Sequence, residues 1–267
     1  MKSVASAGEI ASNYADRRWH SQPGRHMAEK SRLDDILQES LGLQYPLPNL
    51  AWSLKQRNTK IVAFGSSSTA GRFPVVAYPA WLELMLRREF GSQTNSFGKR
   101  MIYMINRGAG GEEASTELPR MQADVIEEAP ALVIWQVGTN AVFRNTEPDF
   151  AFEKVVAAIA EGLDRLAKIP ADVILMDSQF TTAVVKPEKK DLSDRMVNRI
   201  SELAADAGVN VFRRYALMQR MQEVFGMAKL IDPDDPDELH LSDWATRYVT
   251  QALSDQMKKA VNAAGVA

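Results

Sequence analysis

The sequence predicts an α/β fold in which helices cover both faces of a five-stranded parallel sheet, a three-layer α/β/α sandwich. From residue 59 onward, short apolar runs alternate with helical stretches, and this alternation is typical of parallel βαβ units. The runs at residues 132–135 and 173–176 are apolar throughout, as expected of strands that are buried on both faces. Five such runs favour a flavodoxin-like arrangement of the sheet.

The beginning of the chain is expected to lie outside this sheet. Residues 1–30 are polar and show little periodicity, which is typical of a poorly ordered arm. Apolar residues then recur at helical spacing between residues 33 and 41, so an amphipathic helix follows the arm. We therefore divide the chain into a partly disordered extension, residues 1–55, and one main domain, residues 56–267.

The elements of the main domain follow from the pattern of apolar residues. Continuous short runs indicate strands, and longer stretches with apolar residues three and four positions apart indicate helices. The strands are expected at 60–64, 101–105, 131–137, 172–176 and 209–213, and the helices at 79–90, 113–128, 149–168, 191–207, 214–226 and about 242–263.

Charge and composition exclude several classes of function. The formal net charge is -2 and the basic residues are scattered, so the chain offers no electrostatic reason to bind nucleic acid. The chain has no cysteine, which excludes disulfides, thiolate metal sites and a cysteine nucleophile. No run of residues approaches the apolar length of a membrane span.

Three serines stand at the carboxyl end of the first expected strand. They belong to the segment Gly65-Ser66-Ser67-Ser68-Thr69-Ala70-Gly71, and ligands bind at this edge of open α/β sheets. One exposed hydroxyl here can act as a nucleophile if a base and an oxyanion site lie close by. The same serines also suit a turn or a helix N-cap, so the segment by itself leaves both interpretations open.

His240 is the candidate base, because the other two histidines lie in the polar arm. Asp237 precedes it by three positions, and this spacing puts the two side chains on one side of a turn or short helix. A carboxylate there can accept a hydrogen bond from Nδ1–H and leave Nε2 free to take a proton. An acidic helix start is the alternative interpretation of the same residues.

Two more loops follow expected strands and carry groups that can bind an oxyanion. The segment Asn106-Arg107-Gly108-Ala109-Gly110-Gly111-Glu112 follows the second strand, and its glycines permit a close approach of the backbone to a ligand. Gly138-Thr139-Asn140 follows the third strand, and the amide of Asn140 can donate to an oxyanion. A plain turn and an Asx-turn or cap are the alternatives for these two loops.

Together and in this order, the segments resemble the sequence blocks of the SGNH/GDSL hydrolase family over roughly residues 59–255. The first block of that family is usually Gly-Asp-Ser-x-x-x-Gly, which puts Ser67 at the nucleophile position and Ser66 where an aspartate usually stands. Asp237 and His240 match the block that completes the catalytic triad.

The resemblance also implies an oxyanion hole and a reaction. The backbone N–H groups of Ser67 and Gly111 and the side-chain amide of Asn140 would hold the oxyanion. The activity implied is that of a serine esterase, a carboxylic ester hydrolase that works through an acyl-enzyme on Ser67 and requires no metal or other cofactor. An O-acyltransferase with the same triad and a non-catalytic saccharide-binding module are the alternatives.

The substrate is expected to be a small-molecule or glycan ester that carries a short acyl group on a saccharide or another polar alcohol. Tyr78, Arg144 and Gln179 follow the strands and are candidate substrate-binding residues. The resemblance and the polar first residues favour an exported protein, periplasmic or secreted after removal of a signal, with a cytoplasmic protein as the alternative. The oligomeric state is not readable from the sequence.

Overall fold

The computed structural model describes residues 31–33, 35–36, 42–56, 58–91 and 101–265. Its contacts divide the chain into two compact units, Met1–Glu39 and Ser40–Ala267. In the first unit the described residues are helical, and the predicted arm, residues 1–30, lies outside the described residues. The second unit contains the sheet and the candidate site.

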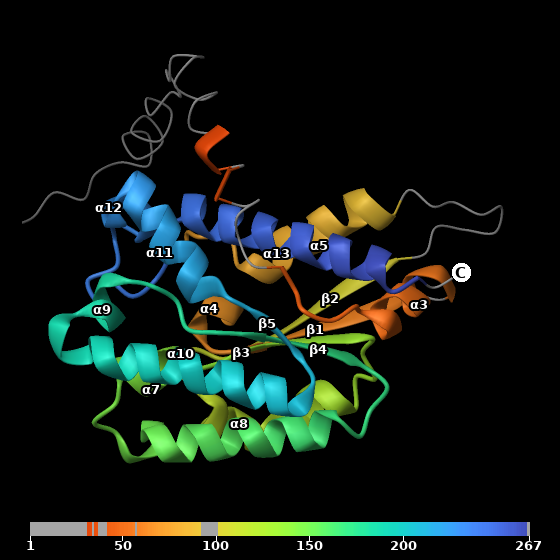
Figure 1. Cartoon of the computed structure of the whole chain (residues 1–267), viewed down its shortest axis with the longest axis horizontal. Helices are drawn as coiled ribbons and strands as arrows, with labels where there is room; N and C mark the ends of the chain where they lie inside the picture. The colour runs from red at the N-terminus through yellow and green to blue at the C-terminus, as the bar shows by residue number, and fades with distance from the viewer. Residues whose placement is uncertain (1–30, 34, 37–41, 57, 92–100, 266–267) are drawn as a thin grey trace, which may run out of the picture. The chain divides into compact units, whose positions relative to one another are not determined.

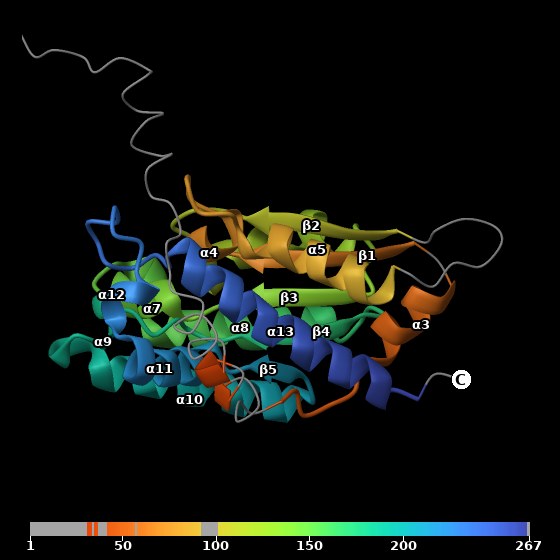
Figure 2. The ribbon, with the colours of Figure 1, turned by 90° about the horizontal axis from the view of Figure 1, so that it is seen from above.

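The predicted parallel sheet forms the centre of the second unit. Its strands are β1 (Thr59–Gly65), β2 (Ile102–Gly108), β3 (Leu132–Gln136), β4 (Asp172–Met176) and β5 (Asn210–Phe212). They lie in the order β2-β1-β3-β4-β5 with every pairing parallel, as Figure 2 shows. This is the strand order of a flavodoxin-like fold, so the predicted class is confirmed.

Helices cover both faces of the sheet, which confirms the three layers (Figure 1). On one face α5 (Tyr78–Phe90) packs against α13 (Asp243–Ala263), and on the other α8 (Phe152–Leu166) packs against α10 (Pro187–Ala207). The other described elements are α3 (Pro48–Gln56), α4 (Ser67–Ala70), α6 (Ala114–Glu117), η1 (Leu118–Arg120), η2 (Gln122–Ile126), α7 (Thr139–Phe143), η3 (Pro148–Phe150), α9 (Thr182–Val185), α11 (Arg214–Phe225) and α12 (Met227–Leu230).

The single helix predicted over residues 113–128 is broken into three pieces. The structure has the α-helical turn α6, the 3-10 turn η1 and the π-helical turn η2 in its place. Pro119 has no N–H with which to continue the α-helical hydrogen bonds, so the regular helix ends before it. Glu113 is the N-cap of α6, and its side chain accepts N–H groups from a neighbouring loop.

Helix α3 is an element that the sequence pattern did not predict. Its first residue is Pro48, a position where the missing N–H has no partner to lose. The N–H groups of Asn49 and Leu50 donate to the carboxylate of Asp172 at 3.3 and 2.8 Å, which joins the helix to the start of β4. Of the helices in the described ranges, none is long and apolar enough to cross a membrane.

Candidate active site

Ser67 lies just beyond β1, at the first residue of the short helix α4. Gly65 ends the strand with φ at +150°, and a Cβ there would lie 2.9 Å from Cβ of Gln136, so the sharp turn requires glycine. The Oγ of Ser67 lies 3.0 Å from Nε2 of His240. The structure therefore brings the predicted nucleophile and the predicted base into hydrogen-bond contact.

Asp235, rather than the predicted Asp237, binds the other ring nitrogen of His240. Its Oδ2 lies 2.9 Å from Nδ1 and also accepts the backbone N–H groups of Leu239 at 2.8 Å and His240 at 2.7 Å. With Nδ1–H donating to Asp235, Nε2 is the acceptor for the hydroxyl proton of Ser67. Ser67, His240 and Asp235 therefore form one hydrogen-bonded series.

The expected contact between Asp237 and His240 is not formed, because the turn before His240 reverses the chain at Glu238. The N–H of Glu238 donates to the carbonyl of Asp235 at 3.1 Å, and Glu238 has a left-handed φ of 53°. This reversal of the chain brings the carboxylate of Asp235, five positions before His240, into contact with the imidazole. The side chain of Asp237 is exposed.

The environment of Asp235 favours its ionised form. Burial by itself would raise its pKa, but hydrogen bonds from the backbone N–H groups of His240 and Leu239 and from the imidazole outweigh burial and lower the pKa. Arg72 adds positive charge nearby, with Nη2 3.9 Å from Oδ1 of Asp235. An ionised carboxylate at this position stabilises the imidazolium that forms when His240 takes a proton.

Gly111 and Asn140 follow β2 and β3, the two strands that flank β1 in the sheet. The side chain of Asn140 donates one N–H to the carbonyl of Glu112 at 2.7 Å, so the two predicted oxyanion donors are neighbours. Among the described residues the backbone N–H of Gly111 has no acceptor. Because parallel strands end at the same edge, both donors stand at the edge that carries Ser67.

Glu113 fixes the loop that carries Asn140. Its carboxylate accepts backbone N–H groups at 2.8 to 3.1 Å, those of Ala114, Gly138, Asn140 and Ala141. Burial raises the pKa of Glu113, and these hydrogen bonds act in the opposite direction. The sequence analysis did not single out this residue; its capping box with Thr116 is the signal that could have found it.

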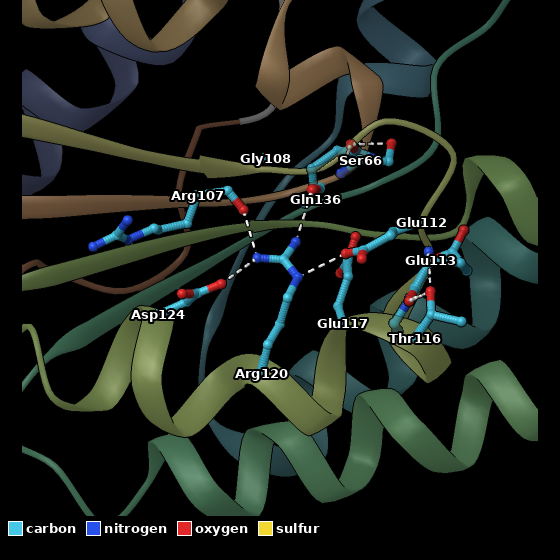
Figure 3. A network of polar contacts seen from close by, with 12 residues as sticks. Ser66, Arg107, Gly108, Glu112, Glu113, Thr116, Glu117, Arg120, Asp124 and Gln136 are labelled. Atoms are coloured by element: carbon cyan, nitrogen blue, oxygen red, sulfur yellow. Dashed lines mark hydrogen bonds and ion pairs between the residues drawn. The ribbon is translucent and has the colours of Figure 1, made fainter.

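Arg120 ties the loop that carries Gly111 to the ends of β1 and β2 (Figure 3). Its Nε donates to Glu112 at 2.7 Å, and its Nη1 donates to the carbonyl of Arg107 at 2.9 Å and to Asp124 at 2.7 Å. The guanidinium also lies over the ring of Phe64, 4.4 Å from the centroid. Through Glu112, the residue after Gly111, Arg120 thus fixes this loop to the sheet.

Ser66, which stands where the resembled family usually has an aspartate, is held by Gln136. Its hydroxyl and its N–H both donate to Oε1 of Gln136, at 2.8 and 3.1 Å. Gln136 is the last residue of β3, adjacent to β1 in the sheet. The turn before Ser67 is therefore hydrogen-bonded without an aspartate.

A cavity of about 50 Å³ lies beside Ser67 and His240. Two of the predicted substrate-binding residues, Tyr78 and Gln179, line it. Gln179 accepts a hydrogen bond from the hydroxyl of Ser68 at 3.1 Å and donates to the carbonyl of Leu239, so its side chain is fixed in the wall. The other walls are mostly apolar and come from α5, α13 and the segment before α5, with Val75, Val76, Val249 and Leu253 among them.

Arg144, the third predicted substrate-binding residue, does not line this cavity. Its guanidinium pairs with Glu147 at 2.7 Å, lies over the ring of Phe150 and donates to the carbonyl of Gly111 at 2.9 Å. The structure therefore places Arg144 against the loop that carries Gly111. Arg214, which the sequence analysis left out, lines the cavity instead.

The described part of the chain contains no group of three or more His, Cys, Asp or Glu side chains that could hold a metal ion. Besides Ser67 and His240, the polar side chains that line the cavity include those of Arg72, Tyr78 and Arg214.

The fold and this site define a carboxylic ester hydrolase built on an α/β/α sandwich. The chain belongs to the non-GDSL lipase-like family, whose model matches residues 35–263. The resemblance to SGNH/GDSL esterases is thereby confirmed, and the family's name agrees with the serine at position 66.

Solved structures show the same fold. An acetylxylan esterase from Geobacillus stearothermophilus is 17% identical, with a TM-score of 0.61, and the match covers 75% of this chain and 94% of that chain. An alpha/beta hydrolase enzyme from the metagenome of Lake Arreo, Spain, is 20% identical, with a TM-score of 0.64, and the match covers 77% of this chain and 97% of that chain. The comparison with curated proteins gave no significant match.

Catalytic mutants of the Geobacillus esterase have also been solved. Three single mutants carry alanine in place of a serine, an aspartate and a histidine, respectively. In the sequence of that enzyme, the aspartate precedes the histidine by three positions. Asp237 has this spacing from His240 in the present chain, whereas Asp235 makes the contact.

Proposed function

We propose that this protein is a serine esterase that hydrolyses a short-chain acyl ester, an O-acyl group on a saccharide or another polar alcohol. The observation that carries the proposal is the hydrogen-bonded series of Asp235, His240 and Ser67 beside a small cavity. Each member has the partner that nucleophilic catalysis by a serine requires.

The reaction proceeds through an acyl-enzyme. Oγ of Ser67 attacks the carbonyl carbon of the ester while Nε2 of His240 takes the hydroxyl proton. The N–H groups of Ser67 and Gly111 and the amide of Asn140 bind the oxyanion. His240 then gives its proton to the leaving alcohol, and a water activated by His240 releases the acid.

Asp235 acts through the imidazole. It keeps the proton on Nδ1, so that Nε2 faces Ser67 as a base, and its negative charge stabilises the imidazolium. It is a positioning residue in this scheme, because it touches neither the substrate nor the nucleophile.

The size of the cavity supports a short acyl group. The cavity of about 50 Å³ is small and lies directly beside Ser67, so a short acyl chain fits there more readily than a long one. A long fatty acyl chain would have to lie outside the cavity.

A polar alcohol is supported by the exposed mouth of the site and by one solved relative. Phe73 is 93% exposed and stands between Arg72 and Val75, which line the cavity, so its ring offers a surface for the alcohol part of the ester. The solved relative from Geobacillus is an acetylxylan esterase, which is a precedent for a saccharide ester on this fold.

The test compares two adjacent serines. Ser67→Ala should lower kcat/KM for 4-nitrophenyl acetate by about 10³-fold or more, because the nucleophile is lost. Ser68→Ala is the matched control: its hydroxyl binds Gln179 and not His240, so it should retain most activity. Undiminished turnover in Ser67→Ala would end the proposal, and analysis of products with an added alcohol acceptor separates hydrolysis from acyl transfer.

A further inference from the structure

Arg214 is a buried cation in the wall of the cavity beside Ser67. It begins α11 at the carboxyl end of β5, and the residue is only 2% exposed. Burial lowers the pKa of its guanidinium to about 10, which still leaves the group protonated at neutral pH. A residue with a full positive charge therefore forms part of the wall of a small and mostly apolar cavity.

Neutral acceptors bind this guanidinium, and no carboxylate pairs with it in the described part of the chain. Nε donates to the backbone carbonyl of Asp177 at 3.0 Å, and Nη2 contacts the hydroxyl of Thr139 at 3.3 Å. An arginine carries five N–H donors in a planar fork, so most of its donors stay available. A buried charge without an ionic partner is costly, which favours an anion beside it.

The carboxylates nearest to Arg214 are weak counter-ions. Asp177 and Glu113 act on it electrostatically from a distance. Burial raises the pKa of Asp177 to about 7 and also raises the pKa of Glu113, so the protein itself disfavours their charged forms. The carboxylate of Glu113 also accepts hydrogen bonds from the backbone N–H groups of Gly138 and Asn140.

Tyr78 adds a second donor on the same cavity. The hydroxyl of Tyr78 is buried beside that of Thr69. Within the described residues, neither hydroxyl has a hydrogen-bond partner in good geometry. Its phenol is close enough to Arg214 for the two to interact electrostatically. Tyr78 and Arg214 thus present unused N–H and O–H donors to one small space lined by apolar groups.

We propose that Arg214, with Tyr78, binds a carboxylate at the far end of the acyl group, so that the preferred substrates are half-esters of short dicarboxylic acids, of the malonyl or succinyl type. The inference rests on the proposed esterase function of Ser67. The planar fork of arginine matches a carboxylate, and Arg214 lines the same small cavity as Ser67, which favours a short dicarboxylic acyl group. Hydrolysis consumes one water and releases the alcohol and the dicarboxylic acid.

The experiment compares acyl groups of equal carbon number on one alcohol. Methyl butyrate and monomethyl succinate are hydrolysed by the full-length protein, and released methanol is measured. Because hydrogen bonds to charged groups are stronger than neutral ones, kcat/KM for the succinyl ester should exceed that for the butyryl ester by about tenfold to a hundredfold. Equal rates, or a preference for butyrate, would overturn the inference while leaving the esterase proposal intact.

Variants then assign the preference to Arg214. In Arg214→Lys, which keeps the charge and loses the fork, the succinyl-to-butyryl ratio should fall at least tenfold. Arg213→Lys is the matched control, because this neighbour binds Ser201 and does not line the cavity, and its ratio should equal that of the wild type. An unchanged ratio in Arg214→Lys would contradict the assignment.

A measurement on the unaltered protein guards against loss of folding in the variants. Succinate should inhibit hydrolysis of methyl butyrate competitively at a concentration at least tenfold lower than butyrate does. Equal inhibition by the two acids would overturn the inference. If neither ester is hydrolysed and Ser67→Ala matches the wild type, the proposed function itself fails and takes this inference with it.

Discussion

Replacing Asp235 or Asp237 by asparagine separates the structural assignment from the sequence motif. Asp235 accepts hydrogen bonds at 2.7 to 2.9 Å from the imidazole and from the N–H groups of His240 and Leu239, whereas Asp237 is exposed. In Asp235→Asn the amide oxygen can still face these donors, because one carboxylate oxygen, Oδ2, accepts all of them. The negative charge is lost, so residue 235 holds the proton on Nδ1 less firmly and no longer stabilises the imidazolium.

The expected loss is large for one variant and small for the other. Replacing the triad aspartate by asparagine in a serine protease costs about 10⁴ in kcat, equivalent to about 5.5 kcal/mol of transition-state stabilisation. We therefore expect kcat for 4-nitrophenyl acetate to fall by roughly 10³ to 10⁴ in Asp235→Asn and by less than about threefold in Asp237→Asn. Thermal unfolding of both variants checks that they fold.

The opposite result would refute the reasoning. If Asp237→Asn were inactive and Asp235→Asn active, the aspartate three positions before the histidine would act here. The turn at residues 235–238 would then have to rearrange in the working enzyme.

Three further predictions follow from the surrounding residues. Asn140→Ala removes one oxyanion donor and should lower kcat by about 10² to 10³ with little change in KM; steady-state kinetics that show only a higher KM would assign Asn140 to substrate binding instead. Glu113→Gln replaces the acceptor of the N–H groups at Gly138 and Asn140, so kcat and the melting temperature should both fall, and a normal kcat in a destabilised variant would deny it a positioning role. Asp177 has its pKa raised by burial to about 7, so the folded state holds a proton that the unfolded chain releases near pH 4, and its contribution to stability decreases as pH rises from about 4 to about 7. Asp177→Asn should therefore gain stability relative to the wild type by up to about 4 kcal/mol between pH 4 and pH 8 in denaturant unfolding, and the exposed control Asp206→Asn should not; parallel curves for Asp177→Asn would contradict the raised pKa.

The sheet and the pairing of Ser67 with His240 could be predicted because they follow from regular features. Buried parallel strands leave continuous apolar runs in the sequence, and their carboxyl ends meet at one edge. That rule places Ser67, Gly111 and Asn140 together without any knowledge of side-chain positions. His240 had no competitor, since the other histidines lie in the arm.

Two features of the site depend on local changes in chain direction that the sequence pattern does not predict. The spacing of Asp237 and His240 suits a regular turn or short helix, and the turn closed by the N–H of Glu238 brings Asp235 to the ring instead. Pro119 breaks a helix that the apolar pattern predicts as continuous, and the short first piece begins with Glu113 as its N-cap.

Long side chains are the other source of error, because their direction is set by tertiary contacts. Arg144 follows β3 and was expected at the substrate, but Glu147 and the carbonyl of Gly111 hold it outside the cavity. Arg214 begins a predicted helix, and no local pattern distinguishes it from an exposed arginine at such a position. Only the packed structure shows that it is buried beside Ser67.

Covalent labelling tests the central claim, that Ser67 is a nucleophile activated by His240. The protein is treated with a fluorophosphonate, and the modified peptide is located by mass spectrometry. The label is expected on Ser67 in the wild type and in Ser68→Ala, greatly slowed in His240→Ala, and absent in Ser67→Ala. A label on Ser68, or labelling of Ser67 at an unchanged rate in His240→Ala, would contradict the account.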